Sequence, residues 1–214
     1  MAPMHQDAAE LLNVYDASGR VTGVRMRHEA KSSGQAVGAV NVLLVNRRGE
    51  VLLQQRPVDK ENGGLWDKSV GGHVSAGEDF DDTAVRETGE ELFDDGATPR
   101  VALARDEDDL RSRTGGRDLS DEVLLCSVGL QLNMRDVRHV PGGGLRNVLY
   151  HVAMYLGRTD VPRAGFRPQS EEIVDLRYMA PGEVDRLLVE GRLAPNMALL
   201  WLSLAWRALS LAGA

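Results

Sequence analysis

The stretch from Gly72 to Glu91 constrains this chain most, because it joins a glycine-rich turn to a strongly patterned helix. Small or apolar residues recur there at every fourth position, the spacing of one helix face: Phe80, Ala84, Thr88 and Leu92. Three carboxylates at i, i+3 and i+4 lie on one patch of the helix surface: Glu87, Glu90 and Glu91. Because these charges repel one another, a hard cation with oxygen ligands, such as Mg²⁺, would stabilise them. The stretch therefore predicts a turn, a helix and a metal site in one element.

A wider set of positions in this stretch resembles the signature of the Nudix hydrolases, G-x5-E-x7-R-E-U-x-E-E-x-G-U, where U is a bulky aliphatic residue. The opening glycine and all charged positions match: they are Gly72, Glu78, Arg86, Glu87, Glu90 and Glu91. So many fixed offsets rarely coincide by chance, which favours the resemblance over a merely solvated acidic helix face. Thr88 and Asp94 replace aliphatic residues, and Phe93 replaces the closing glycine. That glycine normally supplies a left-handed exit residue, so we expect the helix to end differently, with Gly96 as an alternative exit.

The resemblance implies an α/β fold, a Nudix-type α/β/α sandwich with a mixed β-sheet. To this fold the sequence adds an N-terminal hairpin and an apolar C-terminal helix. We expect a flexible leader at residues 1–10 and a single domain at 11–214, with the Nudix signature at 72–94 and an insertion at about 105–147.

The resemblance also implies a metal cofactor, Mg²⁺ or Mn²⁺, and a set of ligands and catalytic residues. The implied metal ligands are the Gly72 carbonyl and the carboxylates of Glu87, Glu90, Glu91 and Glu172. The implied catalytic residues are Glu87, Glu90, Arg86 and Glu172, with Glu87 favoured as the general base. Arg86 would orient a carboxylate through a bidentate pair, although an ordinary helix salt bridge is the alternative. Glu171 is the reserve for Glu172, and Glu78, near the helix start, suits a structural role.

Weaker signals mark residues that flank the expected active site. Arg56, Lys68 and His73 are candidate contacts for substrate phosphates, but solvated cations and a histidine bonded within the turn are the alternatives. Trp66 could stack on a base, and packing in the core is the favoured alternative for a large aromatic side chain.

The implied activity is hydrolysis of a diphosphate linkage in a nucleoside-diphosphate-linked or related small metabolite. A catalytically silent Nudix module that binds a nucleotide or a protein partner is the alternative, and the complete set of glutamates favours the enzyme. The strands before the signature resemble the branch that includes isopentenyl-diphosphate isomerase. That isomerase uses a cysteine where Gly71 stands and histidines in the segment matching 31–37, which has none, so we expect no isomerase activity.

Composition narrows the partners. A net charge of −7 argues against a nucleic-acid partner, which would need a basic surface. The single cysteine, Cys126, lies in an apolar run and predicts a buried thiol in a reducing, cytoplasmic setting. Polar residues interrupt the apolar segment 195–211, so we expect this helix to pack on the domain or on a second subunit, giving a homodimer, and not to span a membrane.

The remaining elements follow from local patterns. Alternating or apolar runs predict strands at 12–15, 21–26, 40–45, 51–56, 123–132 and 149–156, and a short helix at 184–188. The polar segment 31–34 predicts a connection. Dense charge and glycines predict an exposed, mobile loop at 105–122 and a second loop at 134–147.

Overall fold

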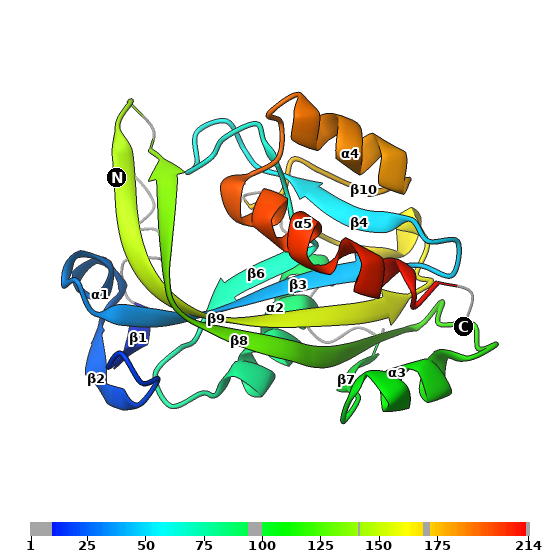
Figure 1. Ribbon diagram of the computed structural model, residues 1–214, viewed down its shortest axis with the longest axis horizontal. Coiled ribbons are helices and arrows are strands. Elements are labelled where there is room, and N and C mark those ends of the chain that lie inside the picture. Colours follow the sequence, from blue (N-terminus) through cyan, green and yellow to red (C-terminus); the bar gives the residue numbers. More distant parts are fainter. Residues whose placement is uncertain (1–9, 94–99, 141, 169–171, 213–214) are drawn as a thin grey trace.

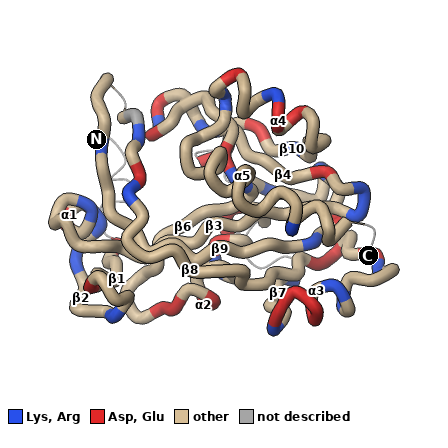
Figure 2. The backbone as a smooth tube through the Cα atoms, viewed as in Figure 1, with Lys and Arg blue, Asp and Glu red and all other residues tan. Residues whose placement is uncertain are grey.

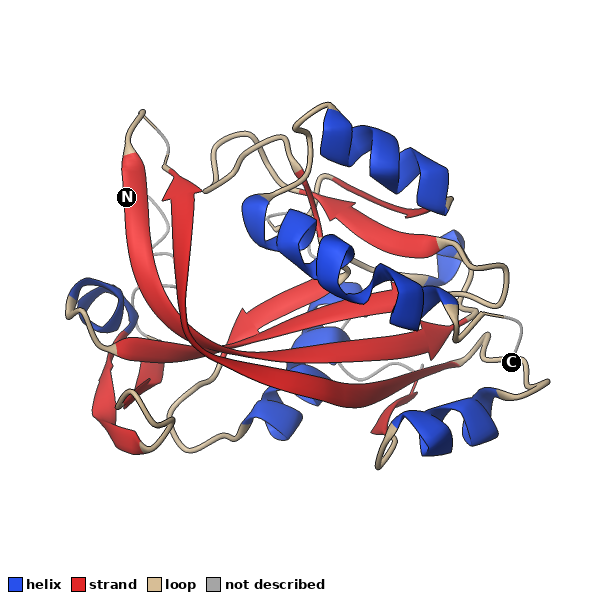
Figure 3. Cartoon of the chain, viewed as in Figure 1, coloured by secondary structure: helices blue, strands red, loops and turns tan. Residues whose placement is uncertain are grey.

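Strands from both halves of the chain form one mixed sheet, with helices on both of its faces (Figure 1). The computed structural model describes residues 10–93, 100–140, 142–168 and 172–212. Most of the expected leader, together with Asp94, Gly96 and Glu171, lies outside these ranges. Figure 3 shows the layers, with helices in front of and behind the sheet. The predicted α/β sandwich with a mixed sheet is confirmed.

The strands have the following bounds: β1 Leu11–Tyr15, β2 Val21–Met26, β3 Ala36–Val45, β4 Val51–Gln55, β5 Trp66–Asp67, β6 Val70–His73, β7 Arg100–Leu103, β8 Glu122–His139, β9 Leu145–Thr159 and β10 Asp175–Met179. The helices are α1 Arg27–Ser32, α2 Phe80–Leu92, α3 Glu107–Thr114, α4 Pro181–Val189 and α5 Pro195–Leu209. The main path through the sheet is β10-β4-β3-β9-β8-β7. Off this path, β1 and β6 pair with β3, β2 pairs with β1, and β5 pairs with β4. β3 runs parallel to β9 and antiparallel to β4 and β6.

The central strand β3 explains the layers, because its side chains alternate between two cores. Leu43 and Val45 face one core, together with residues of α4 and α5. Val42 and Leu44 face the other core, which α2 covers. All four side chains are fully buried. Each face of this strand is apolar because a helix covers each of them.

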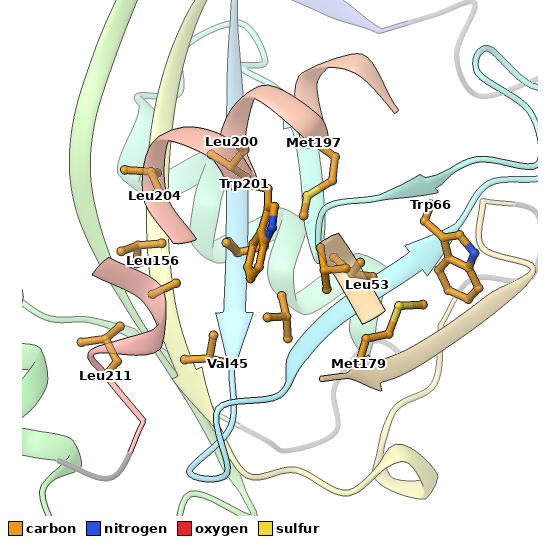
Figure 4. Close-up of a cluster of buried hydrophobic side chains, with 14 of the residues drawn as sticks. Val45, Leu53, Trp66, Leu156, Met179, Met197, Leu200, Trp201, Leu204 and Leu211 are labelled. Carbon is orange, nitrogen blue, oxygen red and sulfur yellow. The ribbon is translucent and has the colours of Figure 1, made fainter. Parts of the chain in front are cut away.

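The C-terminal helix α5 packs on the domain. This was one of the two predicted arrangements, the other being packing on a second subunit. Its buried side chains are Met197, Leu200, Trp201, Leu204 and Ala208, and Figure 4 shows several of them against residues of the sheet. The Trp201 indole donates to Asp185 Oδ1 at 2.7 Å and so ties α5 to α4. Leu199, Leu202 and Trp206 are exposed on the opposite side. No helix among the described residues has both the length and the apolar character needed to cross a membrane.

The expected loop at 105–122 is wrong, because it contains α3. The helix begins after Asp106, whose side chain accepts a hydrogen bond from the Asp109 backbone N–H. Leu110 and Leu119 are fully buried, and Leu110 lies on α3. The surrounding charges concealed these anchors, since they lie on the solvated side of a short helix. Residues 31–34 also differ from expectation, because α1 extends to Ser32.

The expected loop at 134–147 is also wrong. β8 and β9 pair as a long antiparallel ribbon whose register ends at His139↔Leu145. Backbone hydrogen bonds hold such a ribbon, so it needs no apolar face along its whole length. Its register shifts between Gln131 and Met134, where Asn133 has a left-handed φ of 56°. Beyond this bulge the ribbon bends away from the sheet (Figure 1).

Candidate active site

α2 carries the acids of the signature and packs its other side on the sheet. Asp79 caps its start by accepting a hydrogen bond from the Asp82 backbone N–H at 2.8 Å. Ala84, Thr88 and Leu92 are buried, and Phe80 is half-buried. Thr88 suits a position that is aliphatic in the family, because its hydroxyl donates to the Ala84 carbonyl at 2.7 Å.

The end of α2 reflects the loss of the signature's closing glycine. Phe93 follows the helix in an extended conformation, with φ −135° and ψ 146°, and does not adopt a left-handed one. Its ring is buried and lies 5.5 Å from that of Phe166, measured between centroids. A core contact therefore replaces the glycine exit.

Arg86 connects the acids of the signature. Its guanidinium binds both oxygens of Glu78, with Nε–Oε1 at 2.7 Å and Nη2–Oε2 at 2.9 Å. Nη1 also lies 3.0 Å from Glu87 Oε1 and 2.9 Å from Glu90 Oε2. Thr83 donates to the same Glu78 carboxylate at 2.9 Å. The bidentate pair is thus with Glu78, and the same arginine reaches two further acids.

The glycines of β6 make room for charged side chains. A Cβ at Gly72 would lie 1.9 Å from Glu87 Cδ, and one at Gly71 would lie 2.2 Å from Lys68 Cε. Both distances are far below van der Waals contact, so any other residue would displace these side chains. The signature's glycine is therefore needed here because a carboxylate occupies the place of its side chain.

Burial makes this carboxylate patch electrostatically unusual. It raises the pKa of Glu87 to about 7, although the Arg86 guanidinium favours the charged form. Burial and then repulsion from Glu87 raise the pKa of Glu91, and the Lys68 ammonium offsets only part of this effect. Gln54 Nε2 donates to Glu91 at 3.2 Å. Two half-buried acids that resist ionisation fit a divalent cation, which would neutralise them and bind their oxygens.

The other implied ligands pair with cationic side chains. Glu90 contacts Arg86, and Glu172 pairs with Lys60 at 3.2 Å. Among the described residues, no three histidine, cysteine, aspartate or glutamate side chains are already grouped as a metal site. The structure therefore brings Gly72, Glu87 and Glu91 together, and the part of Glu90 and Glu172 in metal binding stays a prediction.

The weaker candidates mostly have internal partners. Arg56 donates to the Glu61 carbonyl at 2.6 Å and pairs with Asp67 at 3.3 Å. Lys68 is buried and pairs with Asp67 at 3.2 Å. Burial, followed by the charges of cations including Lys31, holds the pKa of His73 well below its ordinary value. Trp66 is buried in the core, as the favoured alternative predicted.

The sequence did not reveal a group of cations beside the turn. It consists of Arg27 and Lys31 on α1 and Arg138 and Arg146 on the β8–β9 ribbon, with Glu61 between them. No local pattern could indicate it, because the register of a ribbon expected to be a loop brings these residues together. More than one hundred residues separate the two cations of α1 from the two arginines of the ribbon.

The sandwich fold, with acids packed on its glycine-rich strand, is the arrangement that the Nudix signature predicted. Comparison with known proteins assigns the family. A family model described as a NUDIX domain matches residues 35–200, so the chain belongs to the Nudix family. An uncharacterized Nudix hydrolase of Pseudomonas aeruginosa is 38% identical over 93 residues, 43% of this chain and 55% of that protein.

The chain is also similar to a second curated protein and, in fold, to a solved structure. An isopentenyl-diphosphate Delta-isomerase of Pectobacterium atrosepticum is 36% identical over 78 residues, 36% of this chain and 44% of that protein. The matched region thus spans about half the length of these curated relatives. The crystal structure of DR0079 from Deinococcus radiodurans shares the fold, with a TM-score of 0.62 and 18% identity over 93% of this chain and 99% of that one.

Proposed function

We propose that this Nudix protein is a divalent-metal-dependent hydrolase that cleaves a diphosphate linkage in a nucleoside-diphosphate-linked or related small metabolite. The observation that carries the proposal is the placement of the half-buried Glu87 and Glu91 beside the glycines of β6, with the pKa of both carboxyl groups raised. Holding two such acids together is unfavourable unless a cation binds them. Oxygen ligands of this kind suit Mg²⁺ or Mn²⁺.

We assign metal binding, proton acceptance and positioning to different residues of the site. Glu87, Glu90, Glu91 and the Gly72 carbonyl would hold the ion, with Glu172 as a further ligand. When bound, a divalent ion neutralises phosphate oxygens and lowers the pKa of water. We assign to Glu87 the further role of accepting the proton of the attacking water, because it lies beside Gly72 and Arg86 in the same site. Arg86 positions Glu87 and Glu90 through its contacts of 3.0 and 2.9 Å.

One observation favours a binding module without catalysis. Arg86 already pairs with both Glu87 and Glu90, and the described acids form no ready group of three. In that case the acids would stabilise α2 through Arg86, and the module would bind a nucleotide or a protein without cleaving it.

Phosphate release from a substrate panel separates the two functions. The panel contains nucleoside diphosphates and triphosphates, sugar nucleotides, dinucleoside polyphosphates, coenzyme A and prenyl diphosphates, each with Mg²⁺, Mn²⁺ or a chelator. We expect metal-dependent turnover that falls at least about 100-fold in Glu87→Gln and Glu91→Gln. Glu190→Gln is the control, because Glu190 is exposed beyond the end of α4. Metal-independent turnover, or full activity in both variants, would contradict the proposal. A panel member that binds without being cleaved would favour the binding module.

The proposed role of Glu172 has a separate test. If Glu172 adds a ligand, Glu172→Gln should raise the metal concentration that gives half-maximal activity by about 10- to 100-fold. If Glu172 only pairs with Lys60, then Lys60→Met should reproduce its effect and the metal requirement should stay unchanged.

A further inference from the structure

The cation group beside the turn is made by two elements that meet at one edge of the molecule. Arg27 and Lys31 lie on α1, while Arg138 and Arg146 lie on the bent end of the β8–β9 ribbon, facing the loop that follows β4 (Figure 1). Figure 2 shows the basic residues of α1 and of the ribbon on the same side of the molecule. The overall charge of the protein is −7, so this concentration of positive charge is local.

Acidic partners hold the arginines of this cation group in place. Glu61 accepts from Arg138 at 3.1 Å and from Arg146 at 2.7 Å. Arg138 also donates to Asp136 at 2.6 Å, and Glu10 pairs with Arg27 at 2.6 Å. Burial acts to raise the pKa of Glu61, but the surrounding cations lower it overall, so this bridging carboxylate stays ionised. Carboxylates from separate parts of the chain therefore hold the three arginines in place.

Lys31 is different, because its side-chain ammonium forms no hydrogen bond or ion pair with another described residue. Burial, followed by repulsion from Arg27 and Arg138, lowers the pKa of Lys31 to about 7, and Glu61 only partly opposes this. A half-buried ammonium among like charges destabilises the fold, and Glu61 compensates this only in part. An anionic ligand would compensate the rest.

A chain of contacts connects this cation group to the proposed active site. The Arg138 guanidinium lies over the Tyr150 ring, 5.2 Å from its centroid. Tyr150 Oη lies 3.3 Å from His73 Nε2, and His73 adjoins Gly72 on β6. From the other side, Glu10 is close enough to Glu87 to affect its pKa and also pairs with Arg27. These contacts place the cation group next to the proposed active site, on the side of His73 and Glu10.

We propose that Lys31, with Arg27 and Arg138 beside it, binds a terminal phosphate of the substrate and so selects diphosphates whose outer phosphate is unesterified. A phosphate monoester carries a charge of about −1.5 to −2 and three acceptor oxygens near neutral pH. A phosphate inside a linkage carries a single charge and has fewer free oxygens. A compact ammonium and two arginines suit the first group better than the second. This inference rests on the proposed function for the existence of a diphosphate substrate.

The test measures binding, so that it does not depend on turnover. The probes are the methylene analogues of adenosine and uridine diphosphate, which resist hydrolysis, and the same compounds with a methyl ester on the terminal phosphonate. Calorimetric titration with Mg²⁺ present would use the wild type, Lys31→Met, Lys31→Arg and the control Arg25→Met. Arg25 is an exposed cation of the N-terminal hairpin, outside the cation group. Removing an unfavourable charge should leave Lys31→Met folded, which its melting temperature would verify.

We expect Lys31→Met to weaken binding of the free analogues by about 10- to 100-fold and to change binding of the esters by less than about threefold. Lys31→Arg should keep most of the preference, and Arg25→Met all of it. Equal weakening of free and esterified analogues, no weakening, or no binding of the free analogues by the wild type would overturn the inference. If Lys31→Met removes the preference while the substrate panel gives no metal-dependent turnover, only the hydrolase proposal fails. The reverse result would leave the hydrolase and remove the phosphate subsite.

Discussion

Gly72 is the residue at which the sequence signature and the structure can be tested most directly. In Gly72→Ala the new Cβ would lie 1.9 Å from Glu87 Cδ, so the carboxylate must leave its place. We expect turnover to fall at least about 100-fold, because catalytic groups lose efficiency when they are misplaced by about 1 Å.

Gly89→Ala is the matched control for Gly72→Ala. Gly89 lies on α2, has no atom within 4 Å of an added Cβ, and does not have a left-handed φ. Alanine should therefore preserve activity and stabilise the helix by roughly 0.5–1 kcal/mol. Steady-state kinetics and urea unfolding of both variants provide the measurements. Equal activity in the two variants would show that Glu87 need not occupy the space beside Gly72.

Single residues of the site were predictable where the chemistry is local. The spacing of Glu87, Glu90 and Glu91 places them on one helix patch, and the signature assigned Gly72 and Arg86. Lys31 gave no such signal, because its environment depends on the β8–β9 register and on a loop more than twenty-five residues away. Local sequence spacing cannot report which distant cations a ribbon brings beside a helix.

At the scale of elements, Trp201 is the largest of the side chains that attach α5 to the domain. This indole is buried against the sheet and donates to Asp185 at 2.7 Å, whereas Trp206 on the same helix is 71% exposed. We expect Trp201→Ala to lower the free energy of unfolding by about 3–5 kcal/mol. Trp206→Ala should change it by about 0.5 kcal/mol or less. Similar losses in both variants, measured by urea denaturation, would mean that α5 contacts something on its outer side.

Elements with one clear period were predictable, and elements that mix charge with structure were not. The β3–β4 pair, α2 and α5 all carry clear apolar patterns, since each faces a core. α3 and the end of the β8–β9 ribbon are dominated by charged residues, because only isolated side chains such as Leu110 reach the interior.

The homodimer also stays a prediction. Sedimentation of the wild type beside Leu202→Glu, at a 70% exposed position on α5, would test it.

For the whole molecule, the raised pKa values of the acids on α2 make stability depend on pH and metal. Between the ordinary carboxyl pKa of 4.5 and the value of about 7 for Glu87, the folded protein holds a proton that the unfolded chain has released. The stabilising contribution of protonated Glu87 is therefore complete below pH 4.5 and is lost as the pH rises through about 7. Without metal, the wild type should lose roughly 3 kcal/mol over this range relative to Glu87→Gln.

Urea unfolding at pH 5 and pH 8, with Mg²⁺ or a chelator, measures this dependence. The low pKa of His73 contributes a slope of the opposite sign below its ordinary value of 6.5, but the difference between wild type and variant cancels it. Because ionised carboxylates bind metal best, Mg²⁺ should stabilise the wild type more at pH 8 than at pH 5 and should have little effect on Glu87→Gln. Identical pH profiles for the two proteins in chelator would show that Glu87 is ionised without penalty. A wild type insensitive to Mg²⁺ at pH 8 would show that the acids on α2 stabilise the helix and do not hold a cation.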